Sequence, residues 1–324
     1  MMKRLDTLLH YTIDVFLRTP FPFLAILFGL LGSAPPVQGQ TNDPSAVPAA
    51  ALADIRALKA TPSGSLVLAG QFRNQHHPGG SGTFLASATP AGELLNWQAL
   101  GGTHRSTTMA MAQAPDGSLF WGGVFQGVLE VDLPGRRERF TSGGGLDMLV
   151  LRMQPNGDVL QAWRIGGPGH DILYDLAVDS EGHVFLAGSF EETIDVDPGG
   201  PGNPRWSKGG SDMLAIELDS LGRTVHVLHL GSTSDEAAFR LSLSPTQLIL
   251  SGVFENSLKL SPRNASRFAH GGGTMLAAYD LATLGELRWA QVLDQQPAAS
   301  APQPALKAAF HRDSLVRAPT QPRI

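Results

Sequence analysis

The chain of 324 residues contains no cysteine. Cysteine catalysis, zinc–thiolate sites and thiol redox sensing are therefore excluded. Disulfide bonds are excluded as well, so an exported protein of this sequence must obtain its stability from its core. The region of internal repeats, at about 250 residues, is long enough to bury such a core.

Charge is also scarce, since 16% of the residues are charged and the net charge is −5. This balance is too small and too scattered to indicate nucleic acid or an anionic membrane as a partner. No nucleophile elbow, phosphate-binding loop, dinucleotide fingerprint or zinc motif is present. The 37 glycines and 23 prolines are instead typical of an all-β protein rich in tight turns.

The first 39 residues read as a signal peptide. Lys3 and Arg4 supply a positive start, and the apolar run from Phe21 to Leu31 is short for a membrane span. Val37-Gln38-Gly39 has the small residues of a cleavage site, which predicts cleavage before Gln40. We therefore expect a secreted or cell-surface bacterial protein, the alternative being an uncleaved membrane anchor. Residues 40–51 read as a linker, and the Pro/Ala-rich residues 295–324 as a disordered tail.

A seven-residue strand pattern with glycine near its end and a final phenylalanine occurs four times. Its glycines are 53, 65 and 64 residues apart, which indicates a repeat of several short strands. The four copies end in Gly70-Gln71-Phe72, Gly123-Val124-Phe125, Gly188-Ser189-Phe190 and Gly252-Val253-Phe254. We place the repeats at about 52–105, 106–170, 171–234 and 235–294.

Each repeat has four principal strands joined by tight turns and one longer excursion. Runs such as Leu66–Ala69 and Val184–Ala187 are almost continuously apolar, which indicates strands buried on both faces. In an antiparallel protein, a radial stack of four-stranded sheets provides that burial. The sequence thus predicts an all-β fold, a β-propeller of four repeats with about four antiparallel strands each. The paired small residues, such as Ala69-Gly70, predict a place where backbones crowd.

These motifs also resemble a known family. The strand pattern, the segment Asp195-Val196-Asp197-Pro198-Gly199 and the strand Gly210-Ser211-Asp212-Met213-Leu214 are similar to the SBBP family of bacterial β-propeller repeats, over roughly residues 52–294. The resemblance implies an exported propeller without a shared catalytic site. It also implies seven blades, whereas four are recognisable here. The chain would then close as a four-bladed ring, form an arc that needs a partner chain, or be truncated.

Two aspartates of the third repeat are the candidate metal ligands. Asp195 and Asp197 alternate along one strand and so point to one face, where carboxylates with loop carbonyls can hold calcium. The spacing is not that of a recognised calcium loop, and an aspartate before Pro-Gly commonly forms a turn. We therefore favour the turn role and predict no cofactor, with calcium as the alternative.

Four residues of the repeat-to-repeat connections are the candidate ligand-binding residues. Asp171 and Asp235 occupy matching positions by counting from the strand glycine, and His104 and His170 precede matching strands. The competing interpretation is that each carboxylate hydrogen-bonds the backbone of its own turn, a role that Asp147 and Asp212 also suit. His226 and His229 are three residues apart in one strand, so they face opposite sides and cannot chelate one ion together.

Three functions fit these observations. The first is a non-catalytic exported propeller whose loops bind a protein or a glycan. The second is a hydrolase or lyase acting on polysaccharide, with His104, His170, Asp171 and Asp235 converging at the ring centre. The third is a structural spacer or a remnant of a longer surface protein.

Overall fold

The computed structural model describes residues 54–62, 64–73, 81–100, 105–263 and 268–293. Within these ranges the protein is all-β, with no helical residue, as the sequence predicts. None of the described segments is a helix with the length and hydropathy of a membrane span. The expected signal peptide, the linker of residues 40–51, the tail and His104 lie outside the described residues.

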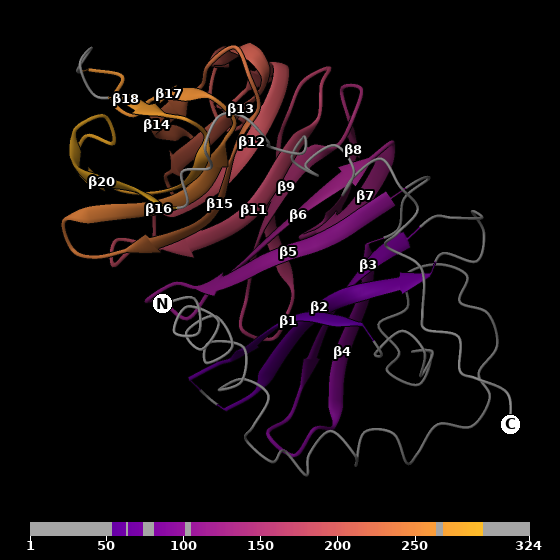
Figure 1. Cartoon of the computed structure of the whole chain (residues 1–324). Helices are drawn as coiled ribbons and strands as arrows, with labels where there is room; N and C mark the ends of the chain where they lie inside the picture. The colour runs from indigo at the N-terminus through magenta and orange to yellow at the C-terminus, as the bar shows by residue number, and fades with distance from the viewer. Residues whose placement is uncertain (1–53, 63, 74–80, 101–104, 264–267, 294–324) are drawn as a thin grey trace, which may run out of the picture. The chain divides into compact units, whose positions relative to one another are not determined.

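The described residues form twenty strands, which follow one another along the chain as β1 to β20. Figure 1 shows their arrangement. The first ten are β1 (Ile55–Ala60), β2 (Leu66–Arg73), β3 (Ser81–Ala88), β4 (Leu94–Leu100), β5 (Arg105–Gln113), β6 (Leu119–Gln126), β7 (Val128–Leu133), β8 (Arg136–Thr141), β9 (Asp147–Met153) and β10 (Val159–Ile165). The others are β11 (Asp171–Val178), β12 (Val184–Asp195), β13 (Pro204–Leu218), β14 (Thr224–Leu230), β15 (Glu236–Leu243), β16 (Gln247–Phe254), β17 (Ser257–Lys259), β18 (Phe268–His270), β19 (Gly273–Asp280) and β20 (Leu287–Leu293).

The chain divides into two compact units. Unit 1 comprises residues 1–141 and 150–162, and unit 2 comprises residues 142–149 and 163–324. In unit 1, β1 to β4 pair in sequence order as an antiparallel meander, and β5 pairs with β6. A single parallel bridge, Ser81 to Arg105, links β3 to β5. A separate hairpin, β7–β8, lies between β6 and β9 in the sequence.

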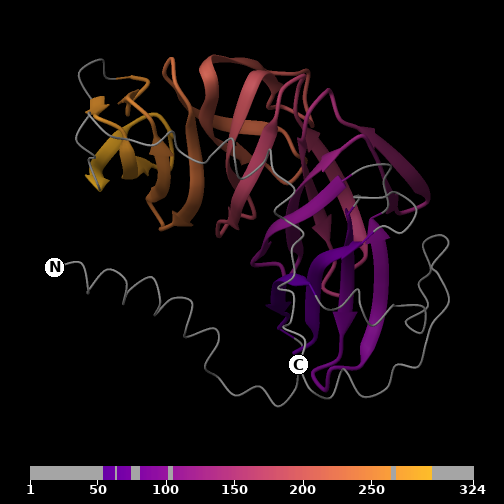
Figure 2. The same ribbon diagram turned by 45° about the vertical axis from the view of Figure 1, so that its right-hand side comes forward.

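Unit 2 contains two four-stranded antiparallel sheets. Strands β11-β12-β13-β14 form one of them and β15-β16-β19-β20 the other. The two sheets lie side by side, in pink to orange and in orange to yellow (Figure 2). Their facing side chains form one core cluster, to which Phe185 and Met213 contribute from the first sheet and Leu250 and Tyr279 from the second. The first sheet is covered on its other face as well, since seven consecutive residues of β12, Val184 to Phe190, are buried.

The glycine of each strand motif has a specific steric reason. A β-bulge interrupts the first strand of each pair, and in all four cases the motif glycine pairs with the residue just before that bulge. A Cβ on Gly188 would lie 2.2 Å from the carbonyl oxygen of Ile172, and one on Gly252 2.3 Å from that of Ala237. The predicted crowding of backbones is therefore confirmed, and its cause is the bulged neighbouring strand.

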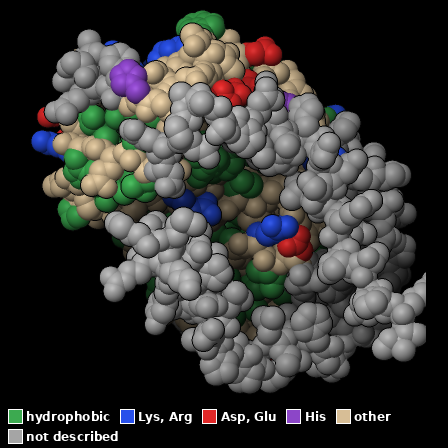
Figure 3. Space-filling model, viewed as in Figure 1, with side chains coloured by type: hydrophobic (Ala, Val, Ile, Leu, Met, Phe, Trp, Pro, Cys, Tyr) green, Lys and Arg blue, Asp and Glu red, His purple; other side chains and the backbone are tan. Residues whose placement is uncertain are grey.

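The second strand of the last sheet, β16, is less buried than the equivalent strands β6 and β12. Buried and half-buried residues alternate along β16, so one face of this sheet is partly exposed. On β20, Trp289 and Leu293 are exposed. Hydrophobic side chains accordingly gather at the surface where Figure 1 places β16 and β20 (Figure 3).

The contact beneath the bulge predicts a large effect of Gly188→Ala. The added methyl group meets backbone that cannot move independently, so we expect a loss of about 2 kcal/mol or more in the free energy of unfolding. Gly285→Ala is the matched control, because its Cβ would meet only the exposed side chain of Arg263, which can rotate away. Urea unfolding of the three proteins measures the difference. Equal losses in both variants would contradict the steric explanation.

Candidate functional site

Two buried carboxylates bind backbone N–H groups at β9 and β13. Asp147 opens β9 and Asp212 lies at the equivalent point of β13, and both are fully buried. Each accepts hydrogen bonds from the backbone N–H four residues earlier, that of Gly143 at 3.2 Å and that of Lys208 at 3.1 Å. A basic side chain of the following strand completes each site, Arg164 for Asp147 and His229 for Asp212.

A second pair of carboxylates repeats this arrangement at the beginnings of β11 and β15. Asp171 accepts the N–H of Gly167 at 2.6 Å, and Glu236 accepts the N–H of Ser232 at 2.9 Å. The donor is again four residues earlier, and both acids are fully buried. We call Asp147, Asp171, Asp212 and Glu236 the anchor carboxylates, because each binds the backbone N–H group four residues before it.

The structural counterpart of Asp171 is Glu236, and the match of Asp171 with Asp235 in the sequence is wrong by one residue. Asp171 pairs with Phe190 of its motif, whereas Glu236 pairs with Phe254. Four residues lie between the paired Leu243 and Leu248, against five between the paired Val178 and Val184, which displaces a count made from the glycine by one. Asp235 instead corresponds to His170.

His170 and Asp235 have equivalent local contacts. The Nδ1 atom of His170 accepts the N–H of Leu146 at 3.1 Å, and the carboxylate of Asp235 accepts the N–H of Ser211 at 2.9 Å. His170 therefore ties a strand connection to the loop before β9, and Asp235 ties one to β13 itself. Of the four candidate ligand-binding residues, the structure brings His170 and Asp171 together through sequence adjacency, and His104 lies outside the described residues.

The anchor carboxylates are close enough to influence one another. Burial, with an addition from the charge of Asp147, raises the pKa of Asp171 to about 8. Burial raises the pKa of Glu236 to about 7, and the charges of Asp212 and Asp235 add to this. The Oδ1 atom of Asp171 is buried and has no hydrogen-bond partner among the described residues. A neutral, protonated carboxyl is the form of Asp171 that suits this environment at neutral pH.

The chemistry open to these acids is limited by access. A general acid must come within hydrogen-bond distance of the substrate. Asp171 and Glu236 have no exposed surface, and their N–H donors belong to their own loops. Their arrangement suits a structural role, in which each carboxyl group hydrogen-bonds the backbone of its own turn. This is the competing interpretation of these residues from the sequence.

Asp195 and Asp197 also bind backbone. Asp195 accepts the N–H of Asp197 at 3.1 Å and that of Asn203 at 2.8 Å. Asp197 accepts the N–H of Thr224 at 2.8 Å. These bonds close the loop between β12 and β13 and attach it to the beginning of β14.

The excursions between the second and third strands carry the most varied exposed chemistry. In the β11–β14 sheet the excursion is an extension of β12 and β13, in which Thr193 pairs with Trp206. Trp206 is 64% exposed, and Pro204 and Lys208 are exposed on the same face of the strand. In the β7–β8 hairpin, Arg136 and Arg137 are exposed beside acidic partners. Trp206 is not among the candidate residues predicted from the sequence. A tryptophan in a polar excursion beside proline is the feature that could have indicated an exposed binding residue.

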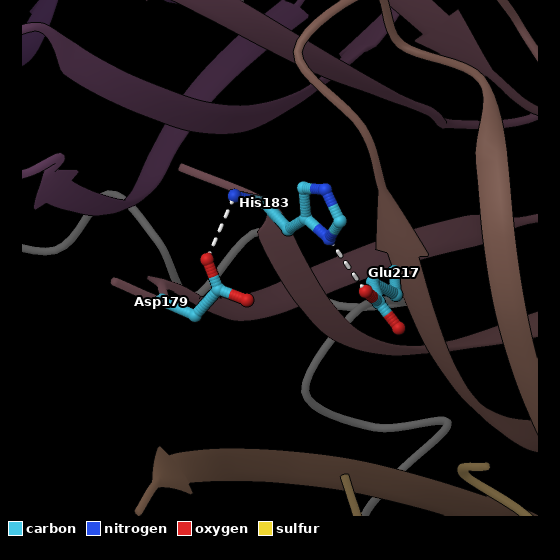
Figure 4. A group of neighbouring side chains, drawn as sticks. All are labelled: Asp179, His183 and Glu217. Carbon is cyan, nitrogen blue, oxygen red and sulfur yellow. Dashed lines mark hydrogen bonds and ion pairs between the residues drawn. The ribbon is translucent and has the colours of Figure 1, made fainter. Parts of the chain in front are cut away.

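One group of side chains has the donor atoms of a metal site (Figure 4). The ligand atoms of Asp179, His183 and Glu217 all lie within 4.8 Å of one another. Glu217 is hydrogen-bonded to His183 and, through its other oxygen, to His226. Burial lowers the pKa of His183, but the hydrogen bond to Glu217 and nearby acidic charges outweigh it, so the net shift is upward. His226 and His229 contact different carboxylates, as their spacing predicts.

The chain was compared with known protein families, curated proteins and solved structures. No known family profile matches the chain, and no curated protein matches it either. Among solved structures, it is similar to a protein of unknown function from Bacteroides caccae, with 13% identity and a TM-score of 0.31. That alignment covers 74% of this chain and 81% of the other. A similarity at this TM-score carries no argument about fold or function.

The raised pKa of Asp171 predicts a pH dependence of stability. A carboxyl that holds its proton more tightly when folded stabilises the protein fully below its ordinary pKa of 3.8, and this contribution is lost as the pH rises to about 8. We expect Asp171→Asn to remove that loss, which is at most about 1.4 kcal/mol per pH unit for one proton.

Urea unfolding between pH 5 and pH 9 measures this effect. Asparagine keeps an acceptor for the N–H of Gly167, so folding is expected to persist. Asp132→Asn, at an exposed residue paired with Arg137, is the control, and its stability is expected to run parallel to that of the wild type. Parallel curves for wild type and Asp171→Asn would contradict the assignment.

Proposed function

We propose that this protein is an exported, non-catalytic β-propeller-type repeat protein that binds a ligand through the excursions of its sheets. The support for this proposal is that buried and exposed polar residues have different roles. The anchor carboxylates are buried and bind backbone, whereas the excursions differ from sheet to sheet and carry exposed side chains such as Trp206 and Arg136. Such a protein presents variable loops on a common framework.

The four-repeat arrangement belongs to this proposal. It is supported by two four-stranded meanders in unit 2, by the β1–β4 meander in unit 1, and by the bulge-and-glycine contact shared by all four motifs. The resemblance to SBBP repeats rests on the same strand motifs and supports export to the cell surface.

The observation that carries the binding role is the exposed indole of Trp206. It stands on an extended hairpin whose loop is fixed by Asp195 and Asp197, so the side chain is presented on ordered backbone. The exposed Lys208 and Asp195 provide charged hydrogen-bonding groups on the same excursion. A flat apolar ring among polar groups suits the face of a sugar, which favours a glycan ligand over a protein.

A second candidate, a structural spacer or a piece of a longer surface protein, is favoured by a different observation. One face of the β15–β20 sheet is partly exposed and carries Trp289 and Leu293. The half-buried residues of that face lie on β16, and the residues of β12 at the equivalent positions of the β11–β14 sheet are buried. This candidate predicts no ligand for the Trp206 hairpin.

Trp206→Ala tests the proposal. We expect the wild-type protein to bind members of a glycan array, and the variant to lose about 2 kcal/mol or more of binding free energy, roughly a 30-fold rise in Kd. Trp289→Ala is the control, because it removes a partly exposed indole from a different surface and should leave binding unchanged.

A panel of surface proteins is screened in parallel. Binding of a surface protein that depends on Trp206 would keep the binding role and replace the glycan. Absence of binding in both panels, or binding that Trp206→Ala leaves intact, would contradict the proposal and favour the spacer.

A further inference from the structure

Three strand ends of the β11–β14 sheet bring two imidazoles to one carboxylate. His183 precedes β12, Glu217 lies near the end of β13, and His226 lies on β14 opposite Glu217. The Nδ1 atom of His183 is 2.7 Å from Oε1 of Glu217, and the Nδ1 atom of His226 is 2.8 Å from Oε2. Both carboxylate oxygens are thus fixed by groups from neighbouring strands.

Glu217 is an unusual residue for its place in the sheet. Its side chain is only 7% exposed, and it follows a run of buried apolar residues from Met213 to Ile216. In the last sheet the equivalent residue is the buried Ala278, which pairs with Ile249 as Glu217 pairs with Phe185, and which also lies just before a register shift. A packed neutral residue therefore fits this position, so the framework alone does not require a carboxylate there.

Asp179 adds a second carboxylate from the turn between β11 and β12. Its Oδ1 atom accepts the N–H groups of Glu181 and His183, which orders the turn and fixes the carboxylate. Its Oδ2 atom has no hydrogen bond to a described residue. In Figure 4, Asp179 and Glu217 lie on either side of the His183 backbone and ring.

The donor set selects one class of ion. One imidazole nitrogen and two carboxylate oxygens within 4.8 Å of one another need only small movements to surround an ion with bonds of about 2.0–2.2 Å. Two carboxylates balance a charge of +2. Calcium prefers six to eight oxygen ligands, whereas imidazole suits zinc and its neighbours in the first transition row.

We propose that Asp179, His183 and Glu217 bind a divalent transition-metal ion of the zinc class. His226 acts as a positioning residue, because its hydrogen bond to Oε2 holds the carboxylate of Glu217 in place. Binding replaces the proton shared between His183 and Glu217, which is released to solvent. The site is independent of the Trp206 hairpin, and its failure would leave the proposed function unaffected.

Isothermal titration of the full chain with Zn²⁺ tests the proposal. We expect His183→Ala to bind one equivalent fewer per chain than the wild type. His226→Ala should keep that equivalent with an affinity lower by about 10–100-fold, as for a residue that orients a ligand. His270→Ala is the control for histidine content, since His270 lies on β18 and is bonded to Ser257, and it should match the wild type.

A second variant covers the case in which His183→Ala does not fold. Asp179→Asn keeps the Oδ1 acceptor of the turn and removes the negative charge, so circular dichroism should show a native fold and the titration a lost or weakened equivalent. Co²⁺ provides an independent readout, because its visible absorption reports coordination by nitrogen and oxygen. The proposal is overturned if wild type, His183→Ala and Asp179→Asn bind Zn²⁺ with equal stoichiometry and affinity, or if the wild type binds none.

Discussion

A backbone N–H that donates to a buried carboxylate four residues later is the interaction on which the sheets of unit 2 depend. It occurs at Asp147, Asp171 and Glu236, where a loop enters a strand, and at Asp212 within β13. Loops that lead into buried strands carry backbone donors that must be satisfied where water is excluded. An oxygen of a side-chain carboxyl group supplies the acceptor, whether the group is charged or protonated. Because these donors are satisfied, the strands can begin at residues that are buried.

This use of acids connects the fold to the proposed function. Carboxylates that would be catalytic candidates in an open pocket are here buried in strand entrances, and Asp171 carries an elevated pKa because it is buried. A shifted pKa accordingly indicates structural burial at this position. The exposed chemistry lies in the excursions, where Trp206 and the arginines of β8 differ from sheet to sheet. The framework and the variable surface are thus built from different residues.

Much of the framework could be predicted from the sequence. The apolar runs, turn glycines and motif glycines indicate all-β structure and crowded strands, because these properties depend on local conformation and burial. The bulges could not be predicted, since the extra residue is defined only by pairing with the next strand. For the same reason Asp235 was matched with Asp171 in place of Glu236, because a turn shortened by one residue changes the count but not the motif.

The candidate sites were less accessible to sequence reasoning. His183, Glu217 and His226 are spread over more than forty residues and meet only through the register of β12, β13 and β14. A single glutamate in an apolar strand was the available signal. Trp206 could have been identified from its polar surroundings, but its exposure depends on how far β12 and β13 extend beyond the sheet.

Native-state hydrogen exchange tests the central claim most directly. Gly167 and Ser232 lie in loops outside the strands, yet their amides donate to buried carboxylates. The account predicts that these two amides exchange as slowly as the buried amides of β12, because all of them exchange only through global unfolding. Exchange of Gly167 and Ser232 as fast as that of exposed loop amides without a hydrogen bond would contradict it.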